Sequence, residues 1–208
     1  TEGTNWQYSW YVPHDVEGLI KLQGGKEAFC TKLDTLFMEK KDGKMEAGSE
    51  DILGRFGEYW HGNEPAHHVA YLYNFAGQPW KAQNLIRRIM ITQYGNKPNS
   101  LCGNDDCGQM SAWYLFNAMG FYPVAPSSNY YSIGTPCAKQ VTVKLRNGRT
   151  FTTKAINYSA ENMYIQSAKL NGKDWNSTLL PVNEVLKGGT LEFVMGAKPN
   201  FKWGTGNK

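Results

Sequence analysis

Residues 106–123 read Asp-Cys-Gly-Gln-Met-Ser-Ala-Trp-Tyr-Leu-Phe-Asn-Ala-Met-Gly-Phe-Tyr-Pro, and the chain changes character where this stretch ends. The stretch predicts a helix that begins near Asp106 and ends at Gly120, because glycine commonly follows the last residue of a helix. Helical patterns dominate before Pro123, and strand patterns follow it. We therefore predict an α+β fold, with helical hairpins in residues 1–122 and an antiparallel β unit in residues 123–208.

Three more helices are predicted before this stretch. They cover residues 26–41, a segment that starts at Pro65 with Asn63 as its cap, and residues 79–94. The turns between them look short, which predicts antiparallel hairpins. The high aromatic content favours part of a larger helical ring over a small self-contained bundle.

The β pattern is clearest at residues 141–145, where apolar and polar residues alternate before Asn147-Gly148, a hairpin turn signal. A strand resumes at 150–153. Further strands are predicted at 163–165 and 191–194, with turns at Asn171-Gly172 and Gly188-Gly189.

Composition excludes several classes of protein. The 208 residues carry a net charge of +4 with the basic residues scattered singly, which argues against nucleic acid as a partner. No apolar run approaches the roughly 20 residues of a membrane span. Cys102 and Cys107 could form a disulfide or remain free thiols, so the redox compartment cannot be inferred. The chain begins at Thr1-Glu2 without a signal peptide, and we expect it to be part of a longer protein.

Two acidic turns are the main functional signal. Residues 62–68 read Gly-Asn-Glu-Pro-Ala-His-His, and residues 103–111 read Gly-Asn-Asp-Asp-Cys-Gly-Gln-Met-Ser. Each places carboxylates beside amide side chains at a predicted helix start, where free N–H groups favour negative charge. We expect the two turns to converge on one polar pocket that holds a hard cation or a sugar.

Individual residues in these turns allow two interpretations. Asp105 and Asp106 could supply a general base or a cation ligand, whereas helix capping would explain only one of them. Glu64 could serve the same pocket or complement a helix dipole. His67 and His68 lack metal-ligand spacing and suit buried histidines or partners of sugar hydroxyls, and His61 could face the pocket.

Glu2 lies close to an aromatic run that contains Trp6, Tyr8 and Trp10. Burial among aromatic rings would raise the pKa of a carboxyl group and suit a general acid. A solvated terminal residue is the simpler interpretation from this chain alone.

Five blocks carry a resemblance to a known family, and they follow one another in order between residues 2 and 135. They are residues 2–8, 13–19, 62–73, 77–80 and 103–123, including Gly-Asn-Asp-Asp-Cys-Gly-Gln-Met-Ser-Ala-Trp-Tyr at 103–114. The sequence resembles the α-mannosidases of glycoside hydrolase family 92. The resemblance implies a calcium-dependent (Ca2+), exo-acting, inverting enzyme that removes terminal α-linked mannose from glycans in the periplasm or outside the cell.

The resemblance also implies an architecture. Such enzymes have an N-terminal β-sandwich packed on an (α/α)6 barrel, with C-terminal strands that return toward the sandwich. This chain would then supply the last helical hairpins and those strands, and its partners would be mannose-containing glycans and the missing N-terminal part of the same enzyme.

Site residues follow from the resemblance position by position. Glu2 matches the general acid and Asp106 the general base, while Asn104 stands where some members have a second acid. The remaining roles are substrate binding by Trp6, His61, Glu64 and Asp105, and calcium binding by Asn63, Asn104 and Asp106.

One position departs from the family pattern. Members specific for α-1,2 linkages carry an acidic residue after the histidine that matches His61, and here that residue is Gly62. The departure argues against α-1,2 preference and leaves α-1,3, α-1,4 or another linkage open. Two other functions stay open: a metal-independent helical-barrel glucosidase and a non-catalytic sugar-binding or structural fragment.

Overall fold

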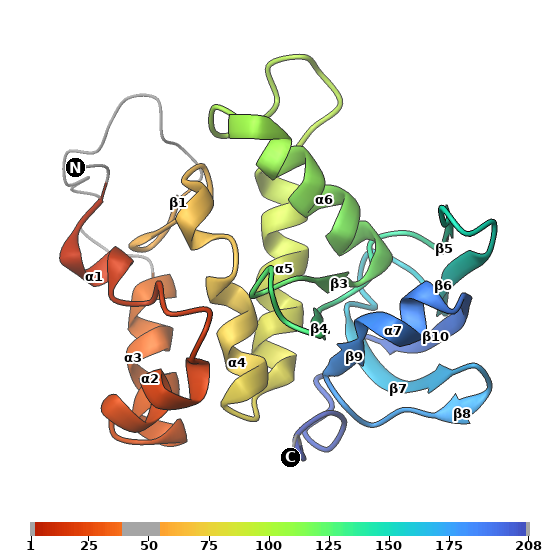
Figure 1. Ribbon diagram of the computed structural model, residues 1–208. Helices are drawn as coiled ribbons and strands as arrows, with labels where there is room; N and C mark the ends of the chain where they lie inside the picture. The colour runs from red at the N-terminus through yellow and green to blue at the C-terminus, as the bar shows by residue number, and fades with distance from the viewer. Residues whose placement is uncertain (1–2, 39–54, 207–208) are drawn as a thin grey trace.

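The computed structural model describes residues 3–38 and 55–206 of the chain. Helices fill the first part and strands most of the second, which confirms the mixed α and β class (Figure 1). The α-helices are α1 (Asn5–Tyr8), α2 (Val16–Leu22), α3 (Lys26–Phe37), α4 (Leu72–Phe75), α5 (Pro79–Thr92), α6 (Gln109–Met119) and α7 (Val182–Leu186). Short 3-10 turns are η1 (Glu64–Ala66), η2 (Val69–Tyr71) and η3 (Asp106–Gly108).

The strands in the described ranges form three sheets. A small hairpin joins β1 (Arg55–Phe56) to β2 (Tyr59–Trp60). A second sheet has the order β3 (Phe121–Tyr122), β4 (Tyr130–Ile133) and β9 (Leu179–Pro181). The largest sheet has the order β5 (Gln140–Lys144), β6 (Thr150–Ile156), β10 (Gly189–Gly196), β7 (Tyr164–Leu170) and β8 (Lys173–Asp174).

The largest sheet departs from the predicted antiparallel unit at one pair. Strands β10 and β6 run parallel, with Phe193 opposite Ala155, whereas its other pairs are antiparallel. Parallel pairing needs a long crossover, and residues 157–188 supply it between these two strands. The predicted turns are confirmed at Gly148 and Gly172, which adopt φ of 80° in the β5–β6 and β7–β8 connections.

The helix from Pro79 is confirmed, and its apolar stripe is buried at Leu85, Ile86, Ile89 and Met90. The single helix predicted from Pro65 is wrong, because that segment forms η1, η2 and α4 instead. In an α-helix the carbonyl of His67 would accept from Tyr71. Here Trp113 Nε1 donates to that carbonyl (3.0 Å), and the N–H of Tyr71 turns to the carbonyl of His68 (3.0 Å).

Two other helix boundaries differ from the prediction. The helix ending at Gly120 begins at Gln109 and not near Asp106, because Cys107 and Gly108 adopt left-handed backbone conformations. The connection from α5 to α6 is also long, spanning residues 93–108, where a short turn was predicted. Of the helix predicted at 26–41, Lys26–Phe37 is observed and residues 39–41 lie outside the described ranges.

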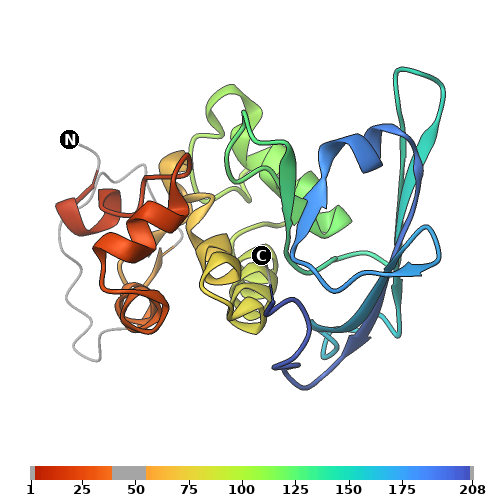
Figure 2. The same ribbon diagram turned by 60° about the horizontal axis from the view of Figure 1, so that its bottom comes forward.

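The core has two clusters that meet at β3. Tyr122 belongs to the helical cluster and Phe121 to the strand cluster, so adjacent side chains on one strand serve both. Buried amide side chains on the helices form hydrogen bonds to the strands. Asn74 Nδ2 donates to Ser132 Oγ (2.8 Å), and the N–H of Ile165 donates to Gln83 Oε1 (3.0 Å). The strands therefore pack directly on the helices (Figure 2). The domain boundary at residue 122 stays a prediction.

Candidate active site

The two acidic turns meet in space, as predicted. The backbone N–H of Asp106 donates to Glu64 Oε1 over 3.1 Å. At the base of the turns, a Cβ added to Gly103 would lie 2.4 Å from the carbonyl oxygen of Gly62, so the two backbones are in close contact. Only glycine allows that approach at position 103.

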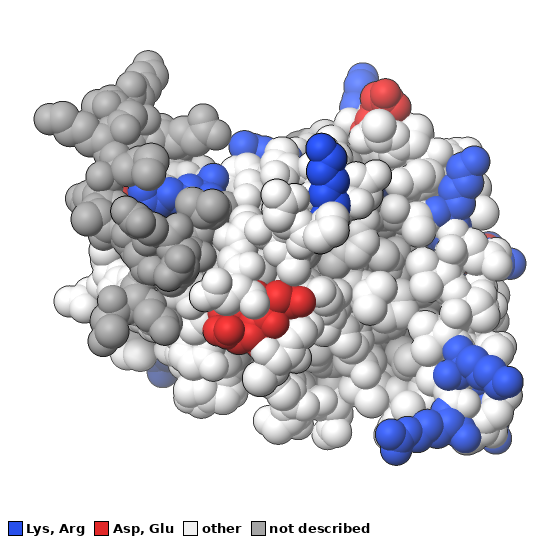
Figure 3. Space-filling model, turned by 90° about the horizontal axis from the view of Figure 1, so that it is seen from above, with Lys and Arg blue, Asp and Glu red and all other residues white. Residues whose placement is uncertain are grey.

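The turns border an open pocket of about 500 Å³. Its polar walls come from Asn63, Glu64, Asn104, Asp106, Gln109 and His67. Tyr11, Tyr122 and four prolines complete the lining, together with Gly62, His68 and Val124. Seen from above, acidic side chains gather in one patch near the middle of the molecule, and lysines and arginines lie mostly toward the edges (Figure 3).

Asn104 and Asp106 are exposed in this pocket. Neither the amide of Asn104 nor the carboxylate of Asp106 makes a hydrogen bond to any residue in the described part of the chain. Asn63 is nearly buried, and its amide donates to the hydroxyl of Tyr8 (3.5 Å). Oxygen atoms of three side chains are therefore available to a ligand.

Asp105 does not line the pocket, and its carboxylate accepts hydrogen bonds from the first turn of α6. It adopts φ of 55°, and its two carboxylate oxygens accept from the N–H (3.0 Å) and the hydroxyl (2.8 Å) of Ser111. Partial burial acts to raise the pKa of Asp105, but hydrogen bonds from Ser111 and the N–H of Met110 outweigh it and lower the pKa. The capping interpretation thus accounts for Asp105, and the pocket is left to Asp106.

A chain of buried hydrogen bonds lies beneath the pocket. Tyr94 donates its hydroxyl proton to the carbonyl of Met110 (3.1 Å), so it accepts from Nε2 of His61 (2.6 Å). Nδ1 of His61 then accepts from the hydroxyl of Tyr59 (2.8 Å). This chain ties β2 to the start of α6. Burial lowers the pKa of His61 well below its usual value, which keeps the ring neutral.

His67 makes a second tie. Its Nε2 donates to the carbonyl of His61 (2.9 Å), which leaves Nδ1 to accept from Gln109 Nε2 (3.3 Å). Gln109 Nε2 also donates to the hydroxyl of Tyr122 (2.9 Å). Burial lowers the pKa of His67 to about 4, although the bond to the His61 carbonyl opposes the shift. A neutral histidine therefore holds the first acidic turn against α6.

The structure gathers some of the predicted site residues and not others. Asn63, Glu64, Asn104 and Asp106 line one pocket. His61 is a correction: it is fully buried with both ring nitrogens engaged, so it positions the turn and does not face the pocket. Trp6 does not line this pocket and packs edge-on against Trp10, with ring centroids 5.2 Å apart. Glu2 lies outside the described residues.

Sequence reasoning missed two aromatic residues of the pocket. Tyr11 has 54% of its surface exposed and packs edge-on against His68, with ring centroids 5.6 Å apart. Tyr122 lies on strand β3, which follows α6. Each stands close before a proline of the lining, Pro13 or Pro123. Aromatic residues just ahead of prolines were the available signal.

The comparison with protein families decides the relationship. Residues 1–197 match the model of the glycosyl hydrolase family 92 catalytic domain. The chain belongs to glycosyl hydrolase family 92. Its geometry agrees, because the motif blocks at 62–73 and 103–123 that suggested the family form the pocket.

Solved family 92 structures resemble the chain closely. An α-mannosidase from Bacteroides thetaiotaomicron, solved in complex with mannoimidazole, is 51% identical with a TM-score of 0.93 over 99% of this chain and 27% of that one. An inverting family 92 mannosidase from B. thetaiotaomicron VPI-5482 is 39% identical with a TM-score of 0.85, over 99% of this chain and 29% of that one.

A fungal relative is matched over a similar share of its own length. A protein of Arthroderma benhamiae described as an uncharacterized secreted glycosidase is 33% identical over 97% of this chain and 24% of its own length. The chain thus spans about a quarter of the length of these relatives. In the part of the chain that the structure describes, no helix has the length and apolar character needed to span a membrane.

The pocket fits a hard cation by donor type. Asn63, Asn104 and Asp106 offer amide and carboxylate oxygens, which calcium prefers. No group of three His, Cys, Asp or Glu side chains suited to a metal occurs within residues 3–38 and 55–206. Amide oxygens, backbone carbonyls and water would therefore supply most ligands, as calcium accepts and zinc does not. Cys102 and Cys107 are both free thiols.

Proposed function

We propose that this family 92 chain forms part of an exo-acting, calcium-dependent, inverting α-mannosidase. The observation that carries the proposal is the exposed carboxylate of Asp106, which has no partner among the described residues and shares a pocket with Asn63, Glu64 and Asn104. The inverting mannosidase among the solved relatives supports the stereochemistry.

Asp106 is the general base in this proposal. An inverting glycosidase needs an ionised carboxylate to take a proton from the attacking water, on the face of the sugar opposite a protonated acid. Asp106 is open to water, and its backbone is fixed through Glu64. Glu2 is the proposed acid, placed by family resemblance and lying outside the described residues.

Asn63, Asn104 and Asp106 are the proposed calcium ligands, and Glu64 is proposed to bind the terminal mannose. Bound calcium would supply a positive charge that grips sugar hydroxyls and favours the flattened ring of the transition state. His61, His67 and Asp105 act on this pocket indirectly, by holding the two turns and the start of α6 in place.

The wider architecture is part of the same proposal. The helices belong to an (α/α)6 barrel that the rest of the longer enzyme completes, and a β-sandwich packs against it. The substrate is a mannose-containing glycan outside the cell or in the periplasm, a location supported by the fungal relative described as secreted. Gly62 in the pocket wall leaves linkages other than α-1,2 as the first to test.

The test uses the full-length enzyme with α-1,2-, α-1,3- and α-1,4-mannobiose, followed by proton NMR from the first turnovers. We expect β-mannose as the first product, loss of turnover with a chelator and recovery with calcium. The α-anomer as first product would exclude inversion. Chelator-resistant hydrolysis of α-glucosides would favour a metal-independent glucosidase, and glycan binding without cleavage would favour a non-catalytic module.

A further inference from the structure

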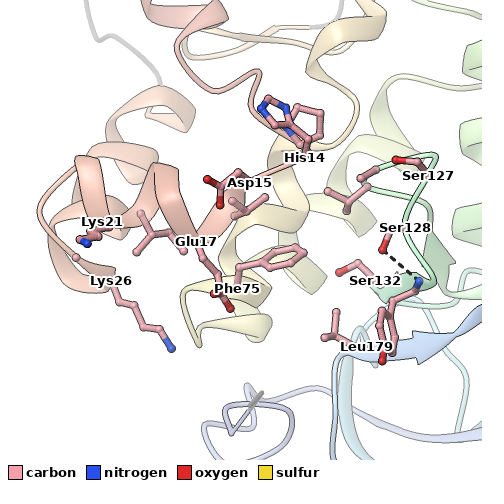
Figure 4. Close-up of a pocket in the computed structure, with 17 residues that line it drawn as sticks. His14, Asp15, Glu17, Lys21, Lys26, Phe75, Ser127, Ser128, Ser132 and Leu179 are labelled. Atoms are coloured by element: carbon pink, nitrogen blue, oxygen red, sulfur yellow. Dashed lines mark hydrogen bonds between the residues drawn. The ribbon is translucent and has the colours of Figure 1, made fainter.

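A second hollow of about 880 Å³ adjoins the acidic pocket, and its size is within the range of ligand-binding clefts. One wall comes from residues 13–26, around α2, and the other from residues 124–132 with Leu179 (Figure 4). Phe75 lies between the walls. Pro13 and Val124 line both this hollow and the acidic pocket, so the two spaces share a border.

The lining of the hollow combines flat apolar surface with many polar groups. Tyr130 has 47% of its surface exposed, and its backbone N–H donates to Oγ of Ser128 (3.2 Å) on the same wall, which Ser127 also lines. On the opposite wall, Glu17 and Lys26 form no ion pair with any described residue. Side chains of both signs suit a neutral ligand rich in hydroxyl groups better than an ion of either charge.

We propose that this hollow is an additional sugar-binding groove for the part of an α-linked glycan that follows the terminal residue. The inference rests on the proposed mannosidase function, which places the glycan end in the acidic pocket. The chain of sugars then crosses the Pro13 and Val124 border, stacks on Tyr130 and hydrogen-bonds to Ser127, Glu17 and Lys26. The enzyme should accordingly favour oligosaccharides over short substrates.

The test compares two substrates in the full-length enzyme: an aryl α-mannoside, which cannot reach the hollow, and a linear α-linked mannotetraose. Tyr130→Ala should raise KM for the tetraose about two- to tenfold, the scale of one lost aromatic contact. Both kcat and KM for the aryl mannoside should stay within about twofold of wild type. Lys26→Ala should act in the same direction.

Lys32→Ala is the matched control, because Lys32 lies on the same helix α3 and does not line the hollow. Circular dichroism checks that each variant is folded. If Tyr130→Ala does not fold, Lys26→Ala replaces it in the comparison. Equal changes for both substrates, or no change for the tetraose, would overturn the groove. An unchanged KM for the tetraose would mean that the rest of the longer protein covers the hollow.

Calorimetry with mannotetraose separates this inference from the proposed function. If the enzyme cleaves no α-mannoside but binds the tetraose, and Tyr130→Ala weakens that binding, the groove stands and the mannosidase proposal fails. If the enzyme cleaves α-mannosides and Tyr130→Ala leaves KM for the tetraose unchanged, the mannosidase proposal stands and the groove fails.

Discussion

The backbone N–H of Asp106 binds Oε1 of Glu64 over 3.1 Å, and this bond joins two turns that are 42 residues apart in sequence. Because the bond uses the backbone of Asp106, the carboxylate of Asp106 remains available to water or a cation. One carboxylate thus fixes the position of the other. This division of roles sets the expectations for substitutions in the pocket.

Asp106→Asn in the full-length enzyme should lower kcat by roughly 10²–10⁴, because the amide keeps the shape of the side chain and loses the base. With calcium at a saturating concentration, KM for the mannoside should stay close to wild type. Asp174→Asn, on the exposed strand β8, is the control and should have no effect. Hydrolysis at the wild-type rate by Asp106→Asn would remove Asp106 from catalysis.

Asp105→Ala should cost about 1 kcal/mol of stability, the usual effect of losing a helix cap. The pKa of Asp105 is lowered in the folded state, so its ionised form stabilises the fold above the unfolded pKa near 3.9. That contribution is lost as the pH falls through the lower folded pKa. In denaturant titrations, the difference between wild type and Asp105→Asn should therefore shrink below about pH 4. A constant difference at all pH values would contradict the capping role.

Local sequence patterns predicted the features of the fold that depend on residues close together in the sequence. The α5 stripe, the Gly120 helix end and the Asn-Gly turns are set by spacing and by φ values that glycine accepts. The convergence of the acidic turns was predictable because both precede helical segments. Sequence spacing did not show that Trp113 would take the carbonyl of His67 and break a helix, since that contact spans 46 residues.

The roles of individual residues at the site depend on tertiary contacts in the same way. His61 resembles a pocket residue in sequence, but its two ring nitrogens are taken by Tyr59 and Tyr94, and Tyr94 lies 33 residues away. Asp105 and Asp106 are neighbours with the same side chain, and the left-handed backbone of Asp105 directs the first to Ser111. Neither distinction has a local sequence signal, because both depend on tertiary contacts.

Stability should fall as the pH drops from about 6.5 to about 4, partly because of His67. Its pKa is lowered to about 4 in the folded state, so the unfolded chain binds a proton more readily across this interval. The full effect of such a shift is about 3 kcal/mol. His67→Gln should therefore show a smaller drop in Tm between pH 7 and pH 4.5 than wild type.

His14→Gln, at an exposed position, is the control that removes one histidine from the surface. His61 and His68 also have lowered pKa values from burial, so the drop in His67→Gln should be reduced and not abolished. An identical drop in wild type and His67→Gln would show that His67 does not resist protonation.

Removal of calcium should abolish turnover and lower Tm, and added calcium should restore both, because a ligand that binds only the folded state stabilises it. Asn104→Ala should raise the calcium concentration for half-maximal activity roughly tenfold or more, the scale found when a metal site loses a supporting residue. Asn96→Ala, at an exposed position outside the pocket, is the control. If Asn104→Ala and wild type require the same calcium concentration, Asn104 is not a ligand.

The 208 residues alone should show no mannosidase activity. They span about a quarter of the length of their solved relatives, and apolar side chains are exposed on α5 and α6, including Ile91 and Leu115 at 60% and 65%. Such surfaces favour association when nothing covers them. A catalytic acid also needs supporting contacts to hold it within about 0.5 Å of its productive position. The purified segment is assayed on α-mannobioses with calcium, alone and after addition of the rest of the enzyme as a separate chain. We expect turnover only in the mixture, and turnover by the segment alone would mean that these residues form a complete glycosidase.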